Sequence, residues 1–182
     1  PVPSRPSPPP TVVRLDPLPI PPGAYSQGTG FVVGDGRYVV TNRHVVEGTT
    51  EIAVRNGIGE VRKAKVLRIA AKDDLAILEL ASAFPSEQSI PTQRMGDART
   101  GRAAIVLGFP MAGILGEQMP SLTSGIVSKA AGFGDDPSTF LLTTKVNKGN
   151  SGGPVFDDRG NLIGVVVSKL DTLKIYEKRG FI

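Results

Sequence analysis

The stretch GTGFVVGDGRYVVTNRHVV, residues 28–46, carries the clearest signal of how this chain folds. Two short runs rich in β-branched residues, Thr29–Val33 and Arg37–Thr41, flank the Gly-Asp-Gly of residues 34–36. Apolar runs on either side of such a turn are typical of a β-hairpin, because glycine adopts the positive φ angles that tight turns need. The second run leads directly to His44, the one histidine of the chain.

Short apolar runs separated by Gly, Pro, Asn and Asp continue along the rest of the chain. They are Glu51–Val54, Val61–Ile69, Leu75–Leu80, Ala103–Leu107, Leu122–Lys129, Thr139–Val146, Val155–Phe156 and Leu162–Ser168. A looser segment, Ser82–Thr100, separates five or six predicted strands from about five more. Two consecutive antiparallel β units predict paired barrels or a sandwich, and periodicity alone does not choose between them.

Composition narrows the class of protein. The 182 residues are 40% hydrophobic and 21% charged, which is typical of a globular chain. There is no cysteine, so a disulfide, a zinc-thiolate site and a cysteine nucleophile are excluded, and with one histidine we expect no metal and no cofactor. The net charge of +4 comes from scattered basic residues, and aromatics make up 5%, so we expect no nucleic-acid partner. No apolar run approaches the ~18 residues of a membrane span.

The beginning of the chain differs from the rest in its proline content. Residues 1–22 hold 10 of the 16 prolines, and proline removes backbone donors and fixes φ. We therefore expect residues 1–22 to be a proline-rich linker or tail, which could lead from an upstream domain, and residues 23–182 to form the folded domain. The sequence predicts no oligomeric state.

The most informative chemical motif is GNSGGP, residues 149–154. A serine among glycines is typical of a tight turn, where the N–H groups of Gly149 and Ser151 could converge on a developing oxyanion. A Gly-x-Ser-x-Gly motif also occurs in α/β-hydrolases, but their histidine follows the serine, whereas His44 precedes it. The chain order His, Asp, Ser is that of the chymotrypsin architecture.

His44 and Asp74 are the candidate partners of the serine. His44 follows a predicted strand and could accept the Ser151 proton as a general base. Asp74 immediately precedes the apolar run Leu75–Leu80 and could orient the imidazole; the alternative is that Asp73 and Asp74 form a polar turn only. These positions predict His44 and Asp74 in the first β unit, Ser151 in the second, and an active site in the cleft between them.

Several motifs occur together, in order, over roughly residues 25–170. They are Gly28–Val33, Val40–Val46, Asp74–Leu78, Val106–Pro110, Thr123–Ser128 and Gly149–Pro154. In this combination the chain resembles the HtrA/Deg branch of trypsin-like serine peptidases. The resemblance implies an all-β fold of two perpendicular six-stranded antiparallel barrels, about residues 23–90 and 101–182. It also implies that the triad aspartate directly precedes the Leu-Ala-Ile-Leu run, which selects Asp74 over Asp73.

The resemblance also implies a function. A serine endopeptidase acting on polypeptides is expected, in an extracytoplasmic compartment, with no cofactor; the alternative is a latent, non-proteolytic scaffold on the same fold. The expected walls of the specificity pocket are Lys145, Val146, Val167, Ser168 and Lys169. Three features differ from the family pattern: Lys148 stands where many members have proline, no PDZ domain follows, and the chain ends at Ile182, before a final strand that the family usually adds.

Overall fold

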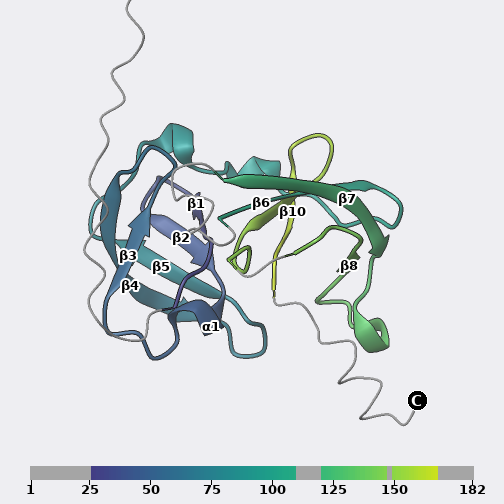
Figure 1. The fold of residues 1–182 in the computed structure, drawn as a ribbon, viewed down its shortest axis with the longest axis horizontal. Coiled ribbons are helices and arrows are strands. Elements are labelled where there is room, and N and C mark those ends of the chain that lie inside the picture. The colour runs from purple at the N-terminus through teal and green to yellow at the C-terminus, as the bar shows by residue number, and fades with distance from the viewer. Residues whose placement is uncertain (1–25, 110–119, 147–148, 168–182) are drawn as a thin grey trace, which may run out of the picture.

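A computed structural model describes residues 26–109, 120–146 and 149–167 of the chain. These residues form two five-stranded antiparallel sheets, which lie side by side in Figure 1. The strand order is β1-β2-β5-β4-β3 in the first sheet and β10-β9-β6-β7-β8 in the second. The expected all-β fold of two consecutive antiparallel units is therefore confirmed. The resemblance implied six strands in each barrel, and the described residues supply five to each sheet.

The first sheet contains the hairpin that the opening stretch predicts. Phe31 lies opposite Val40, and Val33 lies opposite Tyr38, across a turn at residues 34–37. The elements of this half are β1 (Phe31–Val33), β2 (Tyr38–Thr41), a one-turn helix α1 (Arg43–Val46), β3 (Ile52–Arg55), β4 (Val61–Ile69) and β5 (Ala76–Leu80). The sequence did not predict α1.

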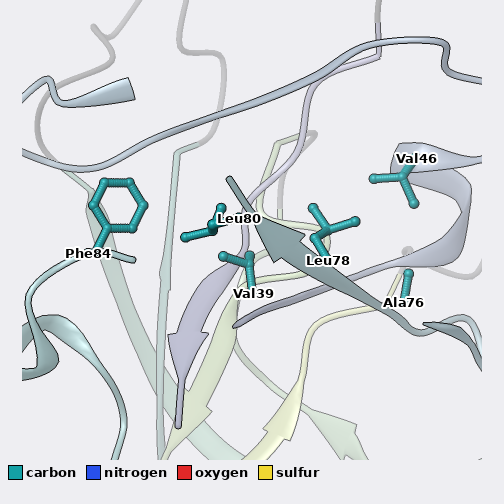
Figure 2. Close-up of a cluster of buried hydrophobic side chains, with 6 residues drawn as sticks. All are labelled: Val39, Val46, Ala76, Leu78, Leu80 and Phe84. Carbon is teal, nitrogen blue, oxygen red and sulfur yellow. The ribbon is translucent and has the colours of Figure 1, made fainter. Parts of the chain in front are cut away.

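The core of the first sheet follows the two-residue period of its strands. In β5, Ala76, Leu78 and Leu80 are buried, while the side chains between them are only partly covered, because successive strand residues point to opposite faces. The buried cluster consists of Val39, Val46, Ala76, Leu78, Leu80 and Phe84 (Figure 2). Burying one leucine side chain contributes about 1.5–3 kcal/mol, so this cluster holds β2, β5 and α1 together.

The second sheet has its own core. Its strands are β6 (Ala103–Gly108), β7 (Ser121–Lys129), β8 (Leu141–Leu142), β9 (Pro154–Phe156) and β10 (Leu162–Val165). Its buried cluster consists of Ala104, Val106, Val127, Val155, Ile163 and Val166. Three 3₁₀ turns, Ser86–Gln88, Thr92–Arg94 and Phe133–Asp135, are the other elements of the described residues, and the first two lie in the looser segment between the sheets.

One predicted strand is much shorter than expected. The run Thr139–Val146 predicted a full strand, but only Leu141–Leu142 pairs with β7 as β8. The reason lies at Thr143, whose side-chain hydroxyl accepts the Ile126 N–H at 3.0 Å, where a backbone carbonyl would continue the ladder. The Thr143 N–H still donates to the Ile126 carbonyl at 3.0 Å, and the regular pairing with β7 ends there.

Candidate active site

His44 and Asp74 meet because their strands are neighbours in the first sheet. Strands β2 and β5 are antiparallel, with Thr41 opposite Ala76, so the residues just beyond that pair lie at the same end of the sheet. The His44 Nδ1 lies 2.5 Å from the Asp74 Oδ2, and the His44 backbone N–H donates to the Asp74 Oδ1 at 3.0 Å. The carboxylate therefore holds both the ring and the backbone of the histidine.

Asp74 is itself fixed through its backbone. Its carbonyl oxygen accepts hydrogen bonds from the Arg43 N–H at 3.3 Å and from the Asn42 Nδ2 at 2.8 Å. Asn42 occupies the N-cap of α1, yet its fully buried side chain makes no cap and binds Asp74 instead. Asp73, the neighbouring candidate, is exposed, so the structure brings Asp74 and not Asp73 to the histidine.

The serine lies in a turn that depends on glycine. Gly149 has a φ of 96°, a left-handed conformation that favours glycine over residues with a Cβ atom. The Gly153 N–H donates to the Asn150 carbonyl at 2.9 Å and closes the turn around Ser151. The Asn150 side chain is buried, and that of Ser151 is half-buried, so the turn is anchored beside the serine while the serine keeps some access to solvent.

The far end of this turn is joined to the second sheet. The Gly152 N–H donates to the Val166 carbonyl, and the Val166 N–H donates to the Gly153 carbonyl, each at 2.8 Å. Val166 directly follows β10 and belongs to the buried core of this half. The second sheet therefore fixes the residues just after the serine.

The first sheet holds the same turn from the other side. The Thr29 N–H donates to the Ser151 carbonyl at 2.9 Å, and the Thr29 hydroxyl donates to the Gly149 carbonyl at 2.5 Å. The approach is close enough that a Cβ atom on Gly152 would clash with the Thr29 carbonyl and with the Thr41 hydroxyl. Contacts between the two halves thus bring the serine turn to the sheet that carries His44 and Asp74.

Two backbone N–H groups beside the serine have no protein acceptor within the described ranges. Those of Gly149 and Ser151 donate to no other described residue, unlike those of Gly152 and Gly153 in the same turn. N–H groups in this state can bind an oxygen that becomes negatively charged.

The expected walls of the specificity pocket are only partly described. Lys145 is exposed, Val146 is half-buried against the second core, and Val167 is 39% exposed. Ser168 and Lys169 lie outside the described residues, as does Lys148.

A cavity of about 440 Å³ lies between the two halves but does not contain the reactive side chains. Phe31, Val39 and Val54 line it from the first sheet, and Leu107 and Phe156 from the second, so its surface is largely apolar. His44, Asp74 and Ser151 are absent from its lining, and the candidate chemistry is therefore outside it.

Three residues of the site were not singled out from the sequence. Thr29 and Thr41 connect the serine turn to the first sheet, and Asn42 supports Asp74. The sequence held an indication for Thr29, because the glycines on both sides of it, Gly28 and Gly30, are typical of a backbone that another segment approaches closely. No local pattern indicated the contact of Asn42 with Asp74, which lies 32 positions further along the chain.

The described residues offer neither a cluster of metal ligands nor a membrane-spanning helix. Among them, no three His, Cys, Asp or Glu side chains gather in a group that could hold a metal ion. No helix in the described ranges is both long and apolar enough to cross a membrane.

Two curated proteins are similar in sequence to most of this chain. An uncharacterized protein of Sinorhizobium fredii is 37% identical over 151 residues, 82% of this chain and 23% of that protein. A probable periplasmic serine endoprotease, DegP-like, of Halomonas elongata is 34% identical over 163 residues, 82% of this chain and 32% of that protein. The chain thus spans about a quarter to a third of these relatives.

Solved structures match the same part of the chain. The HtrA-type protease AlgW with a decapeptide has a TM-score of 0.66 at 25% identity and covers 80% of this chain and 44% of its own. The serine endoprotease from Yersinia pestis has a TM-score of 0.65 at 26% identity, covering 80% and 49%. The family model of the trypsin-like peptidase domain matches residues 28–165. With its two antiparallel half-barrels and these HtrA- and DegP-like relatives, the chain belongs to the trypsin-like peptidase family.

Proposed function

We propose that this chain is a serine endopeptidase that hydrolyses peptide bonds in unfolded or flexible polypeptides through an acyl-enzyme. The observation that carries the proposal is the direct contact of His44 with Asp74 at one end of the first sheet. Ser151 belongs to a glycine turn that Thr29 joins to the same sheet. A nucleophile, a base and an orienting carboxylate are the groups that acyl transfer requires.

Each group has a defined part in the proposed reaction. The His44 Nδ1–H donates a hydrogen bond to the Asp74 carboxylate, so the other ring nitrogen carries a lone pair that can accept the proton of the Ser151 hydroxyl. Ser151 Oγ attacks the scissile carbonyl as His44 removes its proton, and His44 then gives that proton to the departing amine. Water hydrolyses the resulting ester with the same base. The Gly149 and Ser151 N–H groups stabilise the negative oxygen of each tetrahedral intermediate.

The proposed substrate is an extended chain with a small or medium apolar side chain before the scissile bond. Val146 and Val167 are the apolar members of the expected pocket, and the exposed Lys145 keeps its ammonium in water. Burying that ammonium without a partner would be costly, so an acidic preference is disfavoured. Folded proteins rarely present the extended backbone that such a site needs.

The relatives suggest where the enzyme works. Several are named probable periplasmic endoproteases, and we infer an extracytoplasmic compartment for this chain. We also infer that residues 23–182 are the peptidase domain and that residues 1–22 are a linker that could connect it to an upstream partner domain.

The test is labelling by a fluorophosphonate probe, which reacts with a serine only when its base and oxyanion donors are in place. The wild type should be labelled and should degrade casein, and Ser151→Ala should lose both activities with an unchanged circular dichroism spectrum. Ser124→Ala, an exposed serine on β7, is the matched control and should behave as the wild type. A folded wild type that resists the probe would contradict the endopeptidase proposal and support a latent scaffold.

A further inference from the structure

Four hydrogen bonds converge on Thr29, just before β1. Its N–H donates to the Ser151 carbonyl at 2.9 Å, and its own carbonyl accepts the Thr41 hydroxyl at 2.7 Å. Its hydroxyl donates to the Gly149 carbonyl at 2.5 Å and accepts the Phe109 N–H at 2.9 Å. Thr29 is 4% exposed, so these bonds are shielded from water.

The hydroxyl is the part of Thr29 that only a few side chains could supply. A single hydroxyl can donate one proton and accept others, and here it does both between two segments of the second half. It connects the Phe109 N–H, directly after β6, with the carbonyl of Gly149 beside the candidate serine. A hydrogen-bonded chain of this kind is strengthened by mutual polarisation.

The bond to Gly149 bears on the direction of the oxyanion donors. Glycine is the residue with the greatest backbone freedom, and Gly149 has a φ of 96°. Fixing its carbonyl oxygen fixes the plane of the peptide that follows, and hence the ψ angle of Gly149. The φ and ψ angles of Gly149 determine how its N–H is oriented relative to the Gly149–Asn150 peptide, and the buried Asn150 links that peptide to the Ser151 N–H.

We propose that the Thr29 hydroxyl is a positioning group that holds Gly149 in the conformation its N–H needs to bind the oxyanion. Thr29 touches neither the substrate nor the reacting atoms and acts through Gly149. The inference rests on the proposed function, because an oxyanion forms only if Ser151 is a nucleophile. It assigns to the first sheet a part in the oxyanion site, in addition to carrying His44 and Asp74.

The test compares Thr29→Val with Thr29→Ser and with a control hydroxyl elsewhere. Valine keeps the shape of threonine but can neither donate to Gly149 nor accept from Phe109, whereas serine can do both. The control is Ser89→Ala, because the Ser89 hydroxyl donates to the Gly34 carbonyl at 2.9 Å in the same way, at the β1–β2 turn. All variants are made in the complete chain.

The first readout is steady-state hydrolysis of a fluorogenic peptide. Thr29→Val should lower kcat by about tenfold and leave KM within about twofold, because one hydrogen bond acting mainly in the transition state is lost. The rate of fluorophosphonate labelling should fall in parallel. Thr29→Ser should recover most of the loss, and Ser89→Ala should match the wild type.

A second readout does not depend on activity. Amide hydrogen exchange at Gly152 and Gly153, which are bonded to Val166 and Asn150, should accelerate in Thr29→Val and not in Thr29→Ser or Ser89→Ala. Unchanged exchange in Thr29→Val would overturn the positioning role. So would a rise in KM with kcat unchanged, or a Thr29→Ser variant as impaired as Thr29→Val. Failure of the wild type to react with the probe would instead count against the proposed function, while the exchange experiment would still decide the role of Thr29.

Discussion

The two halves of the molecule support their parts of the candidate site in different ways. In the first sheet, His44 and Asp74 are brought together by the pairing of β2 with β5, and every hydrogen bond that a described residue makes to Asp74 comes from residues 42–44. The serine turn of the second half needs contacts from both halves, from Thr29 on one side and Val166 on the other. The first arrangement is a product of one sheet, and the second depends on how the halves fit together.

The largest expected effect on activity concerns the first half, where it distinguishes the roles of the adjacent carboxylates Asp73 and Asp74. Asp74→Asn should lower kcat/KM by about three to four orders of magnitude, because an amide at this position favours the wrong histidine tautomer. Asp73→Asn changes an exposed residue with the same loss of charge and should stay within about threefold of the wild type. Peptide hydrolysis measures both variants, and the opposite ranking would show that the contact with His44 does not serve catalysis.

The next effect concerns the fit between the halves and uses two glycines of similar backbone conformation. Gly152 and Gly160 have φ angles of 86° and 75°, so alanine at either position should cost about 1–2 kcal/mol in backbone strain. At Gly152 the new Cβ would also clash with Thr29 and Thr41, whereas at Gly160 nothing lies within 4 Å. The free energy of unfolding should therefore fall by about 1–3 kcal/mol more in Gly152→Ala than in Gly160→Ala.

Urea unfolding gives both free energies. Equal losses in the free energy of unfolding for the two glycine variants would mean that the contact between the serine turn and Thr29 relaxes without cost. The serine turn would then not depend on how closely the two halves fit together. Should Gly152→Ala fail to fold, the stable Gly160→Ala variant would still show that backbone strain alone is not the cause.

The same difference between the halves explains what could be predicted from the sequence. The β1–β2 hairpin and the alternating burial of β5 depend on neighbours in the chain or in the sheet, and local patterns predicted both. The motif order placed His44 and Asp74 in one half and Ser151 in the other. The contact of Asp74 with His44 then follows from the register of β2 and β5, which local patterns do not give.

Features that arise between segments were not predicted. The Thr29 hydroxyl is hydrogen-bonded to Phe109 and Gly149, which lie 80 and 120 positions further along the chain. No local pattern could therefore indicate its partners. The early end of β8 has a similar origin, because a side chain of Thr143 replaces a backbone acceptor for Ile126. The residues around Thr143 have strand propensity, and the tertiary contact overrides it.

A smaller effect is expected at matching turns of the two sheets. Asn56 bonds to the N–H groups of residues 58 and 60 in the β3–β4 turn, and Asp157 bonds to those of residues 159 and 161 in the β9–β10 turn. Burial raises the pKa of Asp157, but hydrogen bonds from Asn161 and Arg159, with the Arg159 charge, outweigh it and hold this pKa below its ordinary value. The side chain that accepts these bonds is neutral in the first turn and charged in the second.

The lowered pKa of Asp157 determines how its contribution to the stability of the fold changes with pH. The ionised Asp157 stabilises the fold at pH values above its ordinary pKa, and this contribution is lost as the pH falls through the lower pKa of the folded state. Asp157→Asn should therefore cost less than about 1 kcal/mol at neutral pH, and the difference from the wild type should shrink as the pH falls from about 5 to 3. Thermal unfolding across that range measures it, with Asp158→Asn as a control for the change in net charge. A difference that grows with acidity would contradict the assigned direction.

The smallest expected effect is at Lys145, in the segment that leads from β8 to the serine turn. This lysine is exposed, and an ammonium that stays in water has no reason to select the side chain before the scissile bond. Lys145→Ala should therefore leave kcat/KM within about twofold and keep the preference for small or medium apolar residues, as for most surface substitutions. A peptide library randomised at that position decides the question. If the wild type prefers Asp or Glu and Lys145→Ala loses that preference, Lys145 reaches the substrate, and the second half then contributes a charged specificity residue as well as the nucleophile.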